Sequence, residues 1–276
     1  MNGTFRKTLG LTIGLALSTF AASAAADPMP ARETARVLPK SGIAVGLMSP
    51  SAYGLGHGLE VTTMVIPWLL ISPNLSVRAQ LLEKKGLVFS AEYGLAVPSG
   101  AMRLTQGYLF PSYAVTNIKP GFLLQQHAGF WLSGGSKGTW TARIDVTGVF
   151  ANDPNFGPLN SYAPFNLWFG PATGEPRWHL GGTYDHPLTD WLRGRVGLNG
   201  YLMGSSTSDL SPFYVSAEAG LEARLGKRMR LAIGGVWYNY DTHAVEQQAD
   251  DTGRTQNVHV RTNDIYPTFD LVFYSP

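Results

Sequence analysis

The feature that most constrains this chain is a two-residue alternation of apolar and polar side chains that returns along most of its length. Residues 87–98, LVFSAEYGLAVP, place apolar side chains at every odd position from Leu87 to Val97, with Glu92 on the opposite parity. In residues 213–225 every odd position is apolar, whereas Glu218 and Glu222 are even. Successive side chains of a β-strand point to opposite faces. The pattern therefore predicts strands with one apolar face and one polar face.

The alternating runs come in pairs, which are joined by tight Gly- or Lys-bearing turns and separated by longer loops rich in Pro, Asn and Ser. The predicted pairs are 42–55 with 59–66, 74–82 with 87–97, 122–132 with 139–150, 177–186 with 192–203 and 213–225 with 230–240, followed by a last strand at 264–274. These runs make eleven strands. An even count requires twelve, with an irregular strand from the lead-in at residues 27–40, or ten, if the run before Ser49 and Pro50 is not separate.

Two environments explain such strands: a soluble sandwich or barrel with its apolar face inward, and a membrane barrel with its apolar face toward lipid. The runs are about nine to thirteen residues long, which suits a tilted strand that crosses a bilayer and exceeds the usual soluble strand. Short turns alternate with long loops, as they do in bacterial membrane barrels. Aromatic residues recur near strand ends, as an interfacial girdle requires: Tyr53, Trp68, Tyr113, Trp131, Trp140, Trp178, Trp191, Tyr201, Trp237, Tyr238, Tyr240 and Tyr274.

The first 26 residues have the layout of a secretory signal peptide. Arg6 and Lys7 precede an apolar stretch at 9–20, and small residues end it at Ala26. We expect cleavage near Ala26, a periplasmic lead-in at 27–40 and a barrel at 41–276. The chain has no cysteine, so no disulfide is expected.

Composition narrows the functional classes. The chain is 44% hydrophobic and 14% charged, with 21 Lys and Arg against 19 Asp and Glu. Without Arg6 and Lys7 the net charge is close to zero, and no polybasic segment is present to neutralise phosphates, so nucleic-acid binding is not expected. Beyond the signal region no apolar run is long enough for a transmembrane helix.

Together, the signal peptide, the paired alternating strands and the final strand DIYPTFDLVFYSP resemble the outer-membrane β-barrel proteins of Gram-negative bacteria. The resemblance covers residues 41–276 and is one of architecture, not of a characterised family. It implies an all-β, antiparallel up-and-down transmembrane barrel of about twelve strands, with ten as the alternative, located in the outer membrane as a monomer. The ending departs from the usual pattern, because Ser275 and Pro276 follow the aromatic Tyr274.

The polar parity of the strands predicts which charged side chains face the lumen. They either form a network of paired charges that fills a narrow barrel or line a polar conduit. The predicted lumen set is Glu60, Arg78, Glu92, Arg143, Asp145, Arg177, Arg193, Arg195, Glu218, Glu222, Arg224 and Asp270.

Two of the long loops, residues 99–121 and 151–176, are unusually aromatic for segments that should face water. They either pack on one another as a lid over the barrel mouth or bind a hydrophobic ligand or a partner. The candidate residues are Tyr108, Phe110, Tyr113, Phe165, Trp168 and Phe169.

Signals for catalysis are weak. The six histidines show no metal-binding spacing, so no metal or cofactor is expected. Asp241 and His243 resemble the Asp-x-His part of the omptin proteases, but the second acidic pair of that family has no counterpart here. His127 and His179 lack the serine that a His-x-Ser lipase arrangement would need.

The sequence therefore predicts an outer-membrane barrel that binds or passes a small hydrophobic solute through its aromatic loops, with outer-membrane lipid around it and no reaction. The first alternative is a structural or assembly component of the envelope that contacts a partner protein. The second is an omptin-like protease at the rim.

Overall fold

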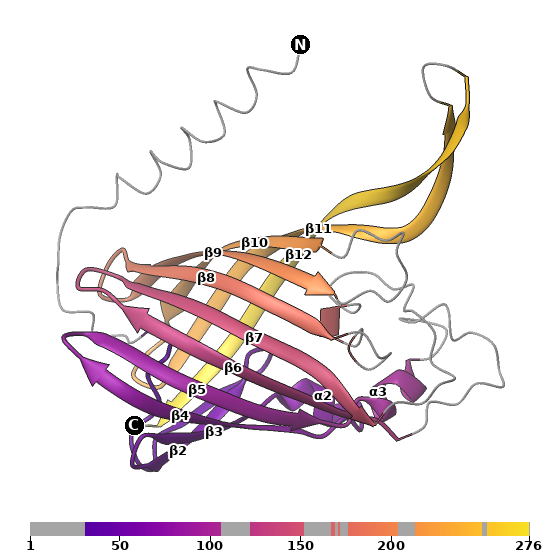
Figure 1. Ribbon diagram of the computed structural model, residues 1–276. Coiled ribbons are helices and arrows are strands. Elements are labelled where there is room, and N and C mark those ends of the chain that lie inside the picture. Colours follow the sequence, from indigo (N-terminus) through magenta and orange to yellow (C-terminus); the bar gives the residue numbers. More distant parts are fainter. Residues whose placement is uncertain are drawn as a thin grey trace.

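The computed structural model describes residues 31–105, 122–151, 167–168, 171, 176–203, 213–249 and 253–275. Its strands form one closed antiparallel barrel in the order β1, β12, β11 and so on down to β2, so neighbours in sequence are neighbours in the sheet (Figure 1). This confirms the predicted twelve-stranded, up-and-down barrel. The predicted signal peptide, residues 1–26, lies outside the described residues.

Twelve strands and two short helices make up the described fold. Their bounds are β1 Ile43–Gly46, β2 Ser51–Gly56, β3 Leu59–Thr63, α2 Val65–Leu69, β4 Asn74–Lys84, β5 Leu87–Ala96, α3 Ser99–Leu104, β6 Leu124–Gly134, β7 Thr139–Ala151, β8 Arg177–Pro187, β9 Leu192–Met203, β10 Phe213–Arg224, β11 Met229–Ala249 and β12 Thr255–Ser275. None of the described helices is long and apolar enough to cross a membrane.

The twelfth strand does not come from the lead-in. Residues 31–40 contain no strand, and the run predicted as one strand at 42–55 instead divides at Ser49 and Pro50 into β1 and β2. The hydroxyl of Ser51 accepts a hydrogen bond from the backbone N–H of Gly46 across this turn, at 3.2 Å. The count was therefore right, but the strand that completes it was wrongly placed.

The two ends of the barrel differ, as predicted. At one end, which we call the short-turn end, the hairpins are tight: His57 and Gly58 join β2 to β3, and Lys85 and Gly86 join β4 to β5, all four with positive φ. Positive φ at both central residues matches the right-handed twist of the flanking strands. At the other end, the long-loop end, the connections carry α2 and α3, and β11 and β12 extend beyond the wall as a two-stranded arm (Figure 1).

The distribution of side chains is inverted relative to a soluble protein. In β5, Leu87 and Tyr93 face outward and are 47% and 50% exposed, whereas Glu92 faces inward and is buried. Large apolar side chains also cover the outside of all the remaining strands. Most of the described buried side chains are polar or charged. Such a surface is typical of a barrel that is surrounded by lipid.

Some of the aromatic residues assigned to the girdle are on the other face. Trp178 and Trp191 lie outside and are about half exposed, but Trp131 points into the lumen and is 6% exposed. Tyr274 also faces inward, with the guanidinium of Arg230 4.0 Å from its ring centroid. Proximity to a strand end therefore did not decide the face, whereas the parity of the strand did.

Candidate functional site

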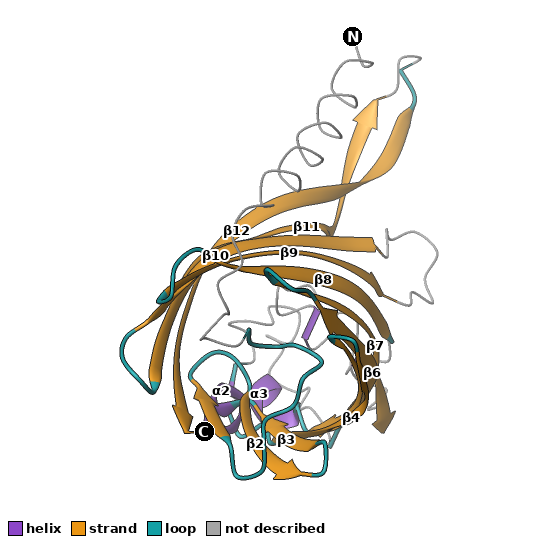
Figure 2. Ribbon diagram, turned by 90° about the vertical axis from the view of Figure 1, so that its left-hand side faces the viewer, coloured by secondary structure: helices purple, strands orange, loops and turns teal. Residues whose placement is uncertain are grey.

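The start of the described chain lies inside the short-turn end of the barrel. We call residues 31–40 the plug (Figure 2). The Nε of Arg32 lies 2.7 Å from Glu222 of β10, and its Nη1 lies 2.7 Å from Asp270 of β12. Nη1 also donates to the hydroxyl of Ser49 at 3.0 Å. One cationic side chain thus ties the plug to two strands and a turn of the wall.

The backbone of the plug is bound by the opposite side of the wall. The N–H of Ala35 donates to Ser133 Oγ at 2.7 Å, and the N–H of Leu38 donates to a carboxylate oxygen of Glu60 at 2.8 Å. Arg78 donates to the carbonyl of Thr34 at 2.9 Å, and Ser90 donates to the carbonyl of Ala35. Because buried backbone groups need partners, inward side chains of β3 to β6 replace the ladder that this irregular segment lacks.

Charges on the plug continue the network of the wall. Glu33 lies 2.7 Å from Arg195, which also contacts Glu218 at 3.2 Å. The Arg195 guanidinium holds the pKa of Glu33 below its ordinary value. Glu222 binds Arg230 at 2.8 Å in addition to Arg32. The short-turn end of the lumen is therefore filled by alternating charges.

A stacked layer lies next to the plug. The Trp131 ring is held between two guanidinium groups, with Arg78 4.1 Å and Arg143 4.4 Å from its centroid. Arg78 binds Glu92 at 2.6 Å and lies 3.8 Å from Glu60. Cation–π contacts gain strength when they are desolvated, as they are here. The stack joins β4, β6 and β7 across the lumen.

Asp145 is the centre of a third cluster. Its carboxylate lies 2.7 Å from Arg143 Nε, 3.3 Å from Arg177 and 2.6 Å from His179 Nδ1. The other ring nitrogen of His179 contacts the amide oxygen of Asn199 at 3.0 Å. Hydrogen bonds on both nitrogens fix the ring plane, so this cluster is rigid.

Glycine makes room for these groups where strands pair. A Cβ on Gly94 would lie 2.2 Å from a ring carbon of His127, and one on Gly197 would lie 2.7 Å from Glu218. Both glycines share the inward parity of their strands. An alanine at either position would therefore force the neighbouring inward side chain to shift.

All of the residues predicted for the lumen take inward-facing positions. Ten of them form ion pairs with other lumen residues or with the plug: Glu60, Arg78, Glu92, Arg143, Asp145, Arg177, Arg195, Glu218, Glu222 and Asp270. Arg193 is 1% exposed, and Arg224 is half-buried at the end of β10.

Sequence reasoning missed Arg32, Glu33, Trp131 and Arg230. The plug residues carry no strand period, so parity could not assign them to the lumen. Arg230 was detectable, because it shares the even parity of the inward residues of β11.

Of the predicted loop residues, only Trp168 is described. It is about half exposed, and its carbonyl accepts a hydrogen bond from Gln125 at 3.0 Å. The neighbouring Leu167 is buried against Met203, Tyr214 and Tyr240. This apolar floor lies near the long-loop end of the lumen. The predicted loop residues Tyr108, Phe110, Tyr113, Phe165 and Phe169 lie outside the described residues.

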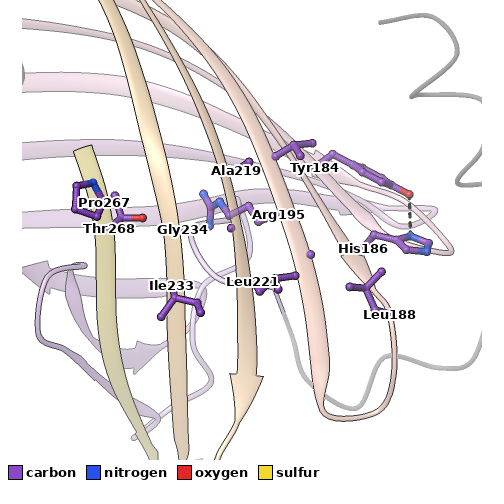
Figure 3. Close-up of a pocket in the computed structure, with 13 residues that line it drawn as sticks. Tyr184, His186, Leu188, Arg195, Ala219, Leu221, Ile233, Gly234, Pro267 and Thr268 are labelled. Atoms are coloured by element: carbon purple, nitrogen blue, oxygen red, sulfur yellow. Dashed lines mark hydrogen bonds between the residues drawn. The ribbon is translucent and has the colours of Figure 1, made fainter. Parts of the chain in front are cut away.

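An apolar hollow of about 760 Å³ is lined by residues of the five neighbouring strands β8 to β12 (Figure 3). Leu188, Leu221 and Ile233 line it together with Gly194 and Gly234, which have no side chains. At one side of the hollow, Tyr184 Oη and His186 Nδ1 are 3.3 Å apart. These residues present carbon surface and no arrangement for chemistry.

The residues considered for catalysis form no described site. Asp241 is fully buried, and the side chain of His243 lies outside the described part of the chain. Among the described residues, no group of three or more His, Cys, Asp or Glu could hold a metal ion.

These features define a closed barrel with an apolar exterior, a charge-filled interior and an internal plug. No family model matches the chain, and no curated protein matches it. Among solved structures, the chain is similar to the crystal structure of a Pseudomonas aeruginosa FadL homologue, with 12% identity and a TM-score of 0.39. The match covers 82% of this chain and 55% of that chain, so the present chain spans about half the length of that structure.

Proposed function

We propose that this protein resides in the outer membrane of a Gram-negative bacterium as a monomeric barrel that binds and passes a small hydrophobic solute. Solute enters at the long-loop end, over the apolar floor around Leu167 and Trp168. The plug closes the short-turn end of the lumen. In this proposal the lumen is a gated path and not an open pore.

The observation that carries the membrane placement is the inversion of the two faces. Exposed Leu, Ile, Phe and Trp side chains cover the outside of the barrel, and ion pairs fill the inside. In water this apolar area would favour aggregation, whereas in hydrocarbon it costs nothing. Each of the twelve strands is also hydrogen-bonded to two neighbours in a closed ring, as a span through lipid requires.

The apolar floor supports a hydrophobic solute. Leu167, Met203, Tyr214 and Tyr240 are buried together, with Tyr201 and Tyr238 packed against them. Ligand sites are mostly apolar, with a few polar groups that fix orientation. Arg177, which donates to the carbonyl of Leu167 at 2.9 Å, holds this layer over the charged network.

Closure of the lumen by the plug can be tested with a reversible disulfide between the plug and the wall. The chain has no cysteine, and the N–H of Ala35 donates to Ser133 Oγ at 2.7 Å, so Ala35→Cys with Ser133→Cys introduces two thiols on segments that are in contact. The double variant is reconstituted in planar bilayers and in liposomes. We expect conductance and solute-driven swelling under reduction and their loss after oxidation. Ala35→Cys alone, given the same oxidant, is the control and should not respond.

A solute is sought by tryptophan fluorescence. The part due to Trp168 is taken as the difference between the wild type and Trp168→Phe, and an apolar ligand should protect it from iodide. If the unlocked protein gives no conductance, no swelling and no protection of Trp168, the transport proposal is wrong.

A structural role is the second candidate, because the arm of β11 and β12 is exposed. Pairing of β10 with β11 ends at Asn239. On the arm side of Arg261, β11 and β12 pair only with each other among the described residues. An isolated hairpin is marginally stable in water, which favours a partner. A stoichiometric envelope protein that co-purifies with the full chain and is lost when the arm is shortened would support this role.

A further inference from the structure

The apolar hollow lined by β8 to β12 lies on the outer face of the wall. Tyr184 and His186 have the same parity as Leu180, which is exposed on the outside of β8. Leu221 and Ile233 also point outward, and they are 44% and 53% exposed. The face that we place against lipid therefore carries a concave site of about 760 Å³, which is within the size range of sites that enclose one ligand.

Small outward residues on neighbouring strands create the hollow. Gly194 of β9 pairs with Leu221 of β10, and Val196 of β9 pairs with Ala219 of β10. A glycine and an alanine thus lie diagonally between two large apolar side chains. The ladder between β9 and β10 is continuous through these pairs, so the hollow comes from the choice of side chains and not from a gap in the sheet.

The hollow runs obliquely from the short-turn end toward the middle of the wall. His186, Gly194, Leu221 and Ile233 are successive register partners across β8, β9, β10 and β11. His186 is one residue from the short-turn end of β8, Ile233 is four residues from that of β11, and Pro267 is eight residues from that of β12. Figure 3 shows His186 near the turn after β8 and Pro267 on the opposite side of the hollow. Because the strands of a closed barrel are tilted, a row across them also changes depth.

The length of this row suits one acyl chain. Four steps of about 4.8 Å between the five strands give a row of about 19 Å. Strands tilted by about 40° raise such a row by about 12 Å along the membrane normal, whereas one leaflet of the hydrocarbon core is about 15 Å thick. Short turns are periplasmic in bacterial barrels, so the row covers most of the periplasmic leaflet.

The polar side chains of the hollow are at its short-turn end. Tyr184 and His186 stack with ring centroids 5.9 Å apart, and the other outward lining residues are apolar. Trp191, in the turn after β8, is 55% exposed at the same end. Exposed tryptophans are enriched at the level of the lipid headgroups. The hollow is therefore polar at headgroup level and apolar from there into hydrocarbon.

Basic side chains flank the polar end. The turns at 135–138, 188–191 and 225–228 contain Lys137, Lys227 and Arg228 against the single acid Asp190. A Cβ on Gly138 would lie 2.7 Å from Tyr184 Oη, so the first of these turns is beside the polar pair. Basic residues at a membrane surface attract anionic headgroups. A second copy of the barrel would instead bring the same basic turns to the same level, where like charges repel.

We infer that the hollow is a binding site for one anionic phospholipid of the periplasmic leaflet. One acyl chain lies over Gly194 and Ala219, and the phosphate lies at Tyr184 and His186, between the basic turns. This inference uses the membrane placement of the proposed function but neither its solute nor its plug, because the site faces away from the lumen.

The first test fills the hollow. Ala219→Phe places a large side chain in it, and Ala217→Phe is the matched control, because Ala217 has the same outward parity on the same strand but does not line the hollow. Native mass spectrometry measures retention of dioleoylphosphatidylglycerol by the full chain released from detergent micelles. We expect a one-to-one complex for the wild type and for Ala217→Phe, and its loss for Ala219→Phe. Equal retention by the two variants would overturn the inference.

Heat-modifiable gel mobility checks that each variant forms the barrel. If Ala219→Phe does not fold, Gly194→Leu fills the hollow from the neighbouring strand and should abolish the same complex. The headgroup is tested with dioleoylphosphatidylcholine, which we expect to be retained less than the glycerol lipid. Lys227→Gln combined with Arg228→Gln should narrow that difference, and an unchanged difference would contradict the position of the phosphate.

The location is tested with phosphatidylglycerol that carries a diazirine in one acyl chain. After irradiation in vesicles, peptides from β9 to β11 should be labelled more strongly than peptides from β4 to β6. Even labelling of all strands would mean an ordinary lipid annulus and would overturn the site, as would disulfide dimers of Ala219→Cys, which would place a second copy over the hollow. A retained lipid without solute passage would keep the site and contradict the proposed function, and solute passage without a retained lipid would do the reverse.

Discussion

At the scale of single residues, the interior depends on charged side chains that are paired around an aromatic ring. Trp131 lies between Arg78 and Arg143, and each guanidinium reaches a carboxylate on its far side, Glu92 or Asp145. The indole therefore keeps two like charges apart while it stabilises both. Removing it would leave a cavity and bring the two guanidinium groups into contact.

Trp131→Ala should lower the free energy of unfolding by about 3 kcal/mol or more, which is the range for a truncated buried tryptophan. Urea unfolding in lipid vesicles measures it. Trp178→Ala removes an indole that is half exposed on the outer face, so it is the matched control and should cost clearly less. Equal losses for the two variants would mean that the stack has no role in stability.

Asp145→Asn tests the cluster around one carboxylate. The change keeps the volume but removes the carboxylate that Arg177 and His179 both contact, and breaking a buried pair from one side costs about 3 kcal/mol or more. Asp190→Asn, in the exposed turn between β8 and β9, is the comparison. Unfolding curves that coincide for the two variants would contradict the structure of this cluster.

At the scale of elements, the plug is held by contacts of unequal worth. Arg32 is largely buried and bridges Glu222 and Asp270, whereas Arg36 forms an exposed pair with Glu83. Exposed pairs contribute between about 0 and 1 kcal/mol, whereas removing one partner of a buried ion pair costs about 3 kcal/mol or more. The two arginines lie four positions apart on one segment and so separate these effects.

Arg32→Ala should loosen the plug and raise ionic conductance, and Arg36→Ala should leave conductance close to that of the wild type. Single-channel recordings in planar bilayers compare them. If Arg36→Ala opened the barrel as far as Arg32→Ala, the exposed end of the plug would be its anchor instead.

At this scale, the sequence predicts the face on which a strand residue lies, but not which residues of different strands meet. Parity placed Glu92, Arg143 and Asp270 inside, because alternation is a local property of each strand. Which charges meet is set by the shear of the closed barrel, and no local pattern states that Arg32 lies beside Asp270. The plug has no period to detect, and the division of residues 42–55 depends on how β12 meets β1, which is a contact between the two ends of the chain.

At the scale of the whole molecule, the two faces of the wall define the solvent that the fold requires. Leu180 lies on the outside of β8 and is strongly exposed. If lipid surrounds the barrel, a charged side chain at this position would lie in hydrocarbon and would destabilise the fold. If water surrounds it, the same charge is harmless.

Leu180→Arg should destabilise the barrel in phospholipid vesicles by about 2–4 kcal/mol, the cost of an arginine near the bilayer midplane. Gln247→Arg, on the exposed arm, should change stability little. Equilibrium unfolding from vesicles distinguishes them, and an unchanged stability for Leu180→Arg would refute the membrane placement.

The contact between β1 and β12 has a consequence for assembly. It is the seam where the cylinder shuts, and it consists of only four residue pairs that join the first strand to the last. The ring cannot be completed before the final residues have been exported. The plug binds Asp270 on one side of the seam and Glu60 and Ser133 on the other, so it links the strands on both sides of the closure. A chain without its plug should therefore refold more slowly into the heat-resistant form, even if every strand is intact.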